Sequence, residues 1–160
     1  MSSLSTMPLH QRIFYGLSLI ITVGGLLYSL EWMVVDIGVR LGVWPREGEF
    51  DAYAFTETLS IWNDIGFYTA IIMGLAALIL LIRRRALALP AYVLALLGGL
   101  TDWVALTGNP FFDGGLDALF LFPAQLINAI IMVFLVHWGV LTWTGSLQRG
   151  FGRIFSLLRR

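Results

Sequence analysis

The fold is decided by the stretch from Ile61 to Leu106, which reads IWNDIGFYTAIIMGLAALILLI over residues 61–82, RRR over 83–85 and ALALPAYVLALLGGLTDWVAL over 86–106. Each apolar run is long enough to cross the hydrocarbon core of a bilayer, which takes about 20 helical residues. The runs are continuous, whereas strands of a membrane β-barrel are shorter and alternate apolar with polar residues. The stretch therefore predicts two membrane-spanning helices joined by a basic turn.

Two further apolar runs flank this pair, one over residues 13–35 and one over residues 116–138. The first run resembles a secretion signal in charge because Arg12 precedes it, but it is too long for a cleaved segment and lacks a convincing small-x-small cleavage site. We expect it to be retained. Four spans (13–35, 61–82, 86–106 and 116–138) predict an all-α fold, a four-helix transmembrane bundle over residues 1–144.

The composition of the 160 residues points the same way. Hydrophobic residues make up 58% of the chain and charged residues only 12%, against roughly a quarter charged in a soluble domain. A soluble globular domain, a disordered chain and a nucleic-acid binder are excluded, since the last would need a basic excess and the formal net charge is zero. The absence of cysteine excludes disulfides, thiol catalysis and cysteine-based metal sites.

The basic residues predict the topology. All ten are arginines, and eight of them fall on one predicted side of the membrane: Arg12, Arg83, Arg84, Arg85, Arg149, Arg153, Arg159 and Arg160. Positive residues mark the cytoplasmic side, so both termini should be cytoplasmic. The connections between spans 2–3 and 3–4 are short, which favours antiparallel neighbours.

The long connection, residues 36–58, is then predicted to be exoplasmic. Asp36 and Arg40 are one helical turn apart, which would allow the first helix to continue past the membrane. Two interpretations stay open for the loop: a membrane-surface lid with interfacial aromatic residues, or a cap that gates a pocket or docks a partner.

Residues 145–160 form a separate basic tail with apolar residues at helical spacing. We expect a C-terminal amphipathic helix on the anionic cytoplasmic leaflet. The residues expected at the membrane surface are Arg149, Phe151, Arg153, Phe155, Arg159 and Arg160.

All ten acids lie between Glu31 and Asp117, and several polar residues fall at similar depth on different spans. An ionisable group inside the bilayer should face the bundle or a wet cavity. The sequence therefore predicts one exoplasm-facing cavity that binds a ligand. Its candidate residues are Tyr28, Glu31, Trp32, Asp64, Tyr68, Asp102, Trp103, Gln125 and Asn128.

Plainer interpretations compete at these positions. Glu31 and Asp64 are near the interface, where they would simply be solvated, and the tryptophans fit an aromatic belt. Gln125 and Asn128 fit interhelical hydrogen bonds. Asp102 is harder to explain, because a short carboxylate cannot easily reach the interface. The glycine pairs at 24–25 and 98–99 would permit close helix approach.

Most cofactor chemistry is excluded or disfavoured. His137 is the one histidine within a predicted span, so a bis-histidine haem is excluded and a single pigment or haem ligand is a minor alternative. No cofactor and no metal is predicted. If the protein is an enzyme, Asp102 with Asp64 or Glu31 would be its acid and base.

The glycine pair before Asp102, with Phe122-Pro123 and Asn128-Ala129, is superficially similar to the last two motifs of lipoprotein signal peptidases. The sequence departs from them, because the glycine-to-aspartate spacing is about a turn short and Ala129 stands near the expected second aspartate.

A broader resemblance covers the second to fourth spans. It is carried by Trp62, Tyr68, the Arg83–Arg85 turn, Leu89-Pro90, Asp117-Ala118-Leu119 and Phe122-Pro123. These residues resemble small four-spanning inner-membrane proteins of Gram-negative bacteria with a DoxX-like layout. The resemblance implies a bacterial inner-membrane location without implying an activity.

Three functional hypotheses follow. The first is a non-enzymatic membrane protein, either an accessory subunit of a larger membrane complex or a binder of a small lipophilic ligand. The second is an intramembrane acid/base enzyme, peptidase-like or isomerase-like, acting on a lipid-like substrate. The third is a small proton-coupled transporter. The expected partners are membrane lipids, other membrane subunits or further copies of the chain.

Overall fold

The computed structural model describes residues 7–46, 51–112 and 116–143, without the side chains of 116–121. This part of the chain is helical, as the sequence predicts. The helices are α1 (Leu9–Arg40), α2 (Ala52–Glu57), α3 (Ile61–Ile82), α4 (Ala88–Leu106) and α5 (Leu116–His137). The predicted amphipathic helix at 145–160 lies outside the described residues.

Three helices, α1, α3 and α4, are long and apolar enough to cross a membrane. The part of α5 whose side chains are described, Phe122–His137, is apolar but shorter. Large apolar side chains such as Ile72 and Ile130 point outward and are more than half exposed. Outward-facing apolar side chains on long helices are what a lipid environment solvates.

Helix α1 is longer than the predicted span and continues to Arg40. Its 32 residues rise about 48 Å at 1.5 Å per residue, well over the roughly 30 Å of hydrocarbon. The last turns can therefore extend beyond the apolar layer. Asp36 and Arg40 form an i,i+4 ion pair there, which matches the spacing noted in the sequence.

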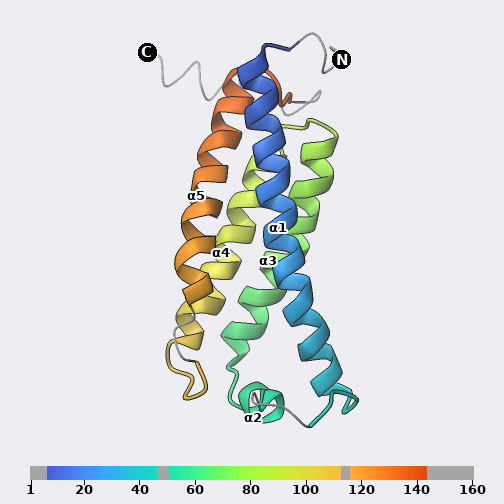
Figure 1. The fold of residues 1–160 in the computed structure, drawn as a ribbon, viewed down its shortest axis with the longest axis vertical. Coiled ribbons are helices and arrows are strands. Elements are labelled where there is room, and N and C mark those ends of the chain that lie inside the picture. Colours follow the sequence, from blue (N-terminus) through green and yellow to red (C-terminus); the bar gives the residue numbers. More distant parts are fainter. Residues whose placement is uncertain (1–6, 47–50, 113–115, 144–160) are drawn as a thin grey trace.

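The four long helices lie side by side, each antiparallel to the next along the chain, and the short α2 lies across one end (Figure 1). Helices α3 and α4 pack most extensively, α1 packs against α3 and α5, and α5 also contacts α4. We call the end that holds α2 the cleft end, after the cleft described in the next section. The opposite end, where α1 begins and α5 finishes, is the arginine end because it carries the turn at 83–85.

The closest approach between helices is the crossing of α3 and α4 at Gly66 and Gly98. A Cβ added at Gly66 would lie 2.5 Å from the amide nitrogen of Asp102 and 2.7 Å from the carbonyl oxygen of Gly98. A Cβ added at Gly98 would lie 2.7 Å from the carbonyl oxygen of Gly66. Backbone meets backbone at both positions, so neither tolerates a side chain without a shift of the helices. Such small-residue contacts are typical of membrane helix pairs.

Only part of the predicted glycine role is therefore seen. A Cβ at Gly24 or Gly99 would meet nothing within 4 Å, and one at Gly25 would meet only the side chain of Gln125. The glycine that pairs with Gly98 is Gly66, which was not among the glycines predicted to permit close helix approach.

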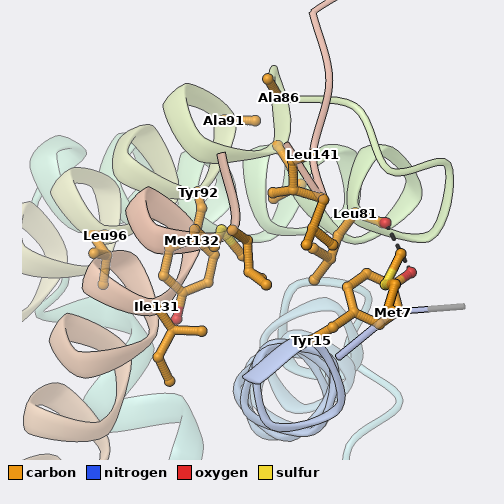
Figure 2. Packing of buried hydrophobic residues seen from close by; sticks show 14 residues of the cluster. Met7, Tyr15, Leu81, Ala86, Ala91, Tyr92, Leu96, Ile131, Met132 and Leu141 are labelled. Carbon is orange, nitrogen blue, oxygen red and sulfur yellow. Dashed lines mark hydrogen bonds between the residues drawn. The ribbon is translucent and has the colours of Figure 1, made fainter. Parts of the chain in front are cut away.

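The buried apolar cluster lies toward the arginine end. Figure 2 shows Leu81, Met132 and Leu141 packed between the helices, with Tyr15 of α1 closing one side. The Tyr15 hydroxyl donates to the carbonyl oxygen of Leu81 at 3.1 Å. This bond joins α1 to the end of α3 where apolar packing is densest.

We predict that Gly66→Ala destabilises the protein, because the new methyl group would overlap the backbone of α4. Overpacking typically costs about 1–3 kcal/mol. The measurement is the midpoint of thermal unfolding in detergent. Gly99→Ala is the matched control, since it adds the same methyl group to open space and should leave the midpoint unchanged or raise it through helix propensity. Equal midpoints for the two variants would contradict the crossing.

Candidate functional site

A cleft opens at the cleft end between α1, α2, α3 and α4. It encloses about 520 Å³ of space, part of which is open to solvent. Its walls are mainly apolar and aromatic, with a few polar groups. The lining residues are Trp32, Val35, Asp36, Phe55, Thr56, Leu59, Asn63, Asp64, Phe67, Asp102 and Leu106. Apolar walls with a few polar groups are the usual character of a small-molecule site.

Helix α2, which forms one wall of this cleft, is held in place by local hydrogen bonds. The Asp51 carboxylate accepts from the backbone amide of Ala54 at 3.0 Å and caps α2. The Tyr53 hydroxyl donates to the carbonyl oxygen of Trp44 at 2.9 Å. The Asn109 amide, beyond α4, donates to Thr58 at 2.8 Å. These bonds tie α2 to the end of α1 and to the segment after α4, so it forms a built wall rather than a loose connection.

Asn63 links the start of α3 to Asp102 of α4. Its Oδ1 accepts from the backbone amide of Ser60 at 2.9 Å, and an amide hydrogen needs an oxygen as its partner. This bond fixes which end of the side chain is the NH₂ group. The NH₂ group then donates to the Asp102 Oδ1 and to the Asp102 carbonyl oxygen, both at 3.1 Å. The close crossing at Gly66, one turn further on, keeps the two helices near enough for these bonds.

A second network is centred on Arg40. Its Nε donates to both carboxylate oxygens of Asp36, at 2.9 and 3.0 Å, and its Nη2 donates to the Asp64 Oδ1 at 2.5 Å. The Tyr68 hydroxyl donates to the Asp36 Oδ2 at 2.6 Å. Two carboxylates therefore share one guanidinium, which balances only one of their two charges. The network also ties α1 to α3 at the rim of the cleft.

Asp102 stands apart from this ion-paired network. It is half-buried, and among the described residues its hydrogen-bond partner is the neutral amide of Asn63. It is therefore the carboxyl in the cleft wall with no cationic partner among those residues. This separates the three cleft carboxyls into two that are held by Arg40 and one that is not.

The structure brings some of the predicted site residues together. Trp32, Asp64 and Asp102 line the cleft, and Tyr68 joins it through Asp36. Tyr28 and Glu31 are exposed on α1 and do not line the cleft. Trp103 is on the outside of α4, edge-on to Phe112 with ring centroids 6.2 Å apart.

Gln125 and Asn128 lie elsewhere. Gln125 is close to Gly25 of α1. Asn128 is fully buried and donates to the Thr22 hydroxyl at 3.0 Å, which in turn donates to the carbonyl oxygen of Ser18 at 2.7 Å. This contact joins α5 to α1, as expected of an interhelical hydrogen bond.

Several lining residues of the cleft were not among the predicted site residues, Asp36 and Asn63 among them. Arg40, which binds Asp36 and Asp64 beside the cleft, was not among them either. Asp36 and Arg40 were assigned to the loop, although their i,i+4 spacing was visible. Asn63 stands three residues after Ser60, the spacing of a helix-capping pair. That pattern predicts a helix start, but it does not reveal that the amide also reaches another helix.

No grouping of three histidines or acids suited to a metal ion occurs within the described part of the chain. His137, the minor candidate for a pigment ligand, is exposed in the last turn of α5. Fold and site together define a helical protein with candidate membrane-spanning helices and an apolar cleft that is lined by a few polar side chains. Comparison with protein-family models, curated proteins and solved structures finds no match to this chain.

We predict that Arg40→Gln lowers the unfolding midpoint in detergent, since it leaves Asp36 and Asp64 facing each other without a cation. Arg40 is 42% exposed, so the expected loss is on the order of 1 kcal/mol. Adding Asp64→Asn should recover part of this loss, because it removes one of the two repelling charges. Arg12→Gln, an exposed arginine on the same helix, should have little effect. Additive losses for Arg40→Gln and Asp64→Asn would contradict a shared network.

Proposed function

We propose that this chain is a non-enzymatic integral membrane protein of four spans that binds a small amphipathic ligand in the cleft between α1, α2, α3 and α4. The three long apolar helices support membrane insertion. The 22-residue α5, packed against α1 and α4, supports a fourth span. The arginine distribution supports cytoplasmic termini and an exoplasmic cleft. The DoxX-like resemblance supports a bacterial inner-membrane location.

The observation that carries this proposal is the combination of apolar walls with Asp102. Trp32, Phe55 and Phe67 offer aromatic surface to an apolar chain or ring. Asp102 offers a carboxyl that no cation neutralises among the described residues. A ligand with an apolar body and a cationic or hydrogen-bond-donating head fits both. The head would gain a charge-assisted hydrogen bond, the stronger kind in a partly dehydrated site.

Asp36 and Asp64 have a different role in this proposal. Both are held by Arg40, so a cationic head would have to displace the guanidinium to reach them. They shape the rim and keep α1 against α3. Asp102 is then the residue that selects the head group.

An acid/base enzyme is the second candidate, favoured by one observation. Asp64 and Asp102 line the same cleft, but of these two only Asp64 has an ion pair with another described residue. Two carboxyls in unlike environments are the usual arrangement of an acid and a base. This candidate requires Asp64 to act from within its contact with Arg40. A simple binding role for Asp102 requires no such step and is preferred.

We predict that Asp102→Asn keeps the fold and weakens binding of a cationic amphiphile by at least about tenfold, the usual value of a hydrogen bond to a charged group. The fold should persist because an asparagine oxygen can still accept from Asn63. The probe is a nitroxide-labelled alkylammonium in nanodiscs, measured by quenching of Trp32 fluorescence, with Trp32→Phe to identify that signal. The uncharged alcohol of equal chain length should bind both proteins alike.

Glu31→Gln is the matched control, since it removes a carboxylate that does not line the cleft. It should bind the probe like the native chain. Equal binding by Asp102→Asn and the native chain would overturn the proposal. Turnover of a lipid-like substrate that disappears in both Asp102→Asn and Asp64→Asn would favour the enzyme instead.

A role as an accessory subunit predicts a different observation. Native gel electrophoresis after mild detergent extraction should then show the chain in a larger complex with stoichiometric partners. The ligand-binding proposal expects a species at the mass of one or two copies. Stoichiometric co-purification of other membrane subunits would therefore favour the accessory role.

A further inference from the structure

A second pocket lies at the arginine end, remote from the cleft. Its lining is formed by the turn between α3 and α4, the segment that follows α5, and Met7 before α1. The lining residues are Met7, Arg83, Arg84, Arg85, Gly139, Val140 and Thr142. The pocket encloses about 410 Å³, part of it open to solvent.

The backbone around this pocket is held in a defined shape. The amide of Ala86 donates to the carbonyl oxygen of Thr142, and the amide of Thr142 donates to the carbonyl oxygen of Arg84, both at 3.0 Å. The amide of Arg85 donates to the carbonyl oxygen of Leu80 at 2.8 Å. Arg84 adopts a φ of 52°, a left-handed conformation that residues other than glycine adopt rarely. The turn is thus fixed against the end of α5.

The charge at this pocket is strongly positive. Three guanidinium-bearing residues line it. The acids whose side chains are described lie toward the cleft end of the structure, away from this pocket. They are Glu31, Asp36, Asp51, Glu57, Asp64 and Asp102. An anion is therefore the complementary ligand.

Topology alone does not account for this arrangement. The positive-inside effect needs basic residues in a cytoplasmic connection, but it does not need them to line a pocket pinned to another helix. The surroundings indicate the source of the anion. Trp138 packs against His10, Phe14 and Phe134 at this end, and such aromatic clusters mark the level of lipid head groups.

We propose that the pocket lined by Arg83, Arg84 and Arg85 binds the phosphate group of an anionic phospholipid. Guanidinium groups match phosphate oxygens in geometry and charge. Met7 and Val140, which belong to the buried apolar cluster, border the same pocket, and the aromatic residues around Trp138 pack at the same end. A free phosphate would satisfy the arginines but would gain nothing from these apolar neighbours.

The experiment is native mass spectrometry of the full chain released from detergent with phosphatidylglycerol, phosphatidylcholine or inorganic phosphate. We expect phosphatidylglycerol to be retained in preference to phosphatidylcholine, and Arg83→Gln/Arg85→Gln to weaken its retention. About fivefold per arginine is expected from the effect of one basic residue near an anionic leaflet. Inorganic phosphate should not displace the lipid. Displacement at millimolar phosphate would overturn the lipid assignment in favour of a soluble phosphate.

Arg12→Gln is the matched control, because Arg12 is exposed near the same end without lining the pocket. It should retain phosphatidylglycerol like the native chain. Equal losses in Arg12→Gln and Arg83→Gln/Arg85→Gln would mean a diffuse charge effect and would sink the site. Asp102→Asn should bind this lipid normally, so the result is independent of the ligand proposed for the cleft.

Discussion

The backbone contact between Gly66 and Gly98 is the constraint on which the arrangement of this protein depends. In a bilayer there is little hydrophobic force to drive one apolar helix against another, so close packing and hydrogen bonds must hold the pair. The absence of a side chain at both glycines lets α4 approach until the Asp102 amide nitrogen would be 2.5 Å from a Cβ at residue 66. At that approach Asn63 donates to Asp102. The geometry of the cleft wall thus follows from two missing methyl groups.

The molecule divides into two ends with different chemistry. The cleft end holds every acid whose side chain is described, and there one arginine serves two carboxylates. The arginine end holds the apolar cluster and a pocket lined by three arginines. Within the described part of the chain, the acids are therefore separated from Arg12 and from the arginines of the 83–85 turn. The two sites proposed above accordingly differ in preference, one for a cationic or donor head group and one for phosphate.

Much of the fold could be predicted from hydropathy, because long continuous apolar runs have few alternatives to helices in a bilayer. The predicted run 61–82 coincides with α3, and 86–106 differs from α4 by two residues. The site was less predictable. Depth along a helix follows from counting residues, so Asp64 and Asp102 were placed at one end. The direction in which a side chain points around the helix axis could not be predicted in this way, because helix rotation depends on packing. Glu31 is exposed, whereas Asp36, about one and a half turns later, lines the cleft.

The sequence by itself determined the helical class, the positions of the long apolar helices and the segregation of acids from arginines, because these depend on composition and on residue order alone. Tertiary structure decided which polar groups meet. Arg40, predicted to lie in the loop, is the last residue of α1 and bridges Asp36 and Asp64, because the last turns of α1 lie beside α3. Asn63 became the partner of Asp102 because the glycine crossing brought α4 within reach. These pairings join residues 24 and 39 positions apart, and such distant partners are chosen by packing rather than by local pattern.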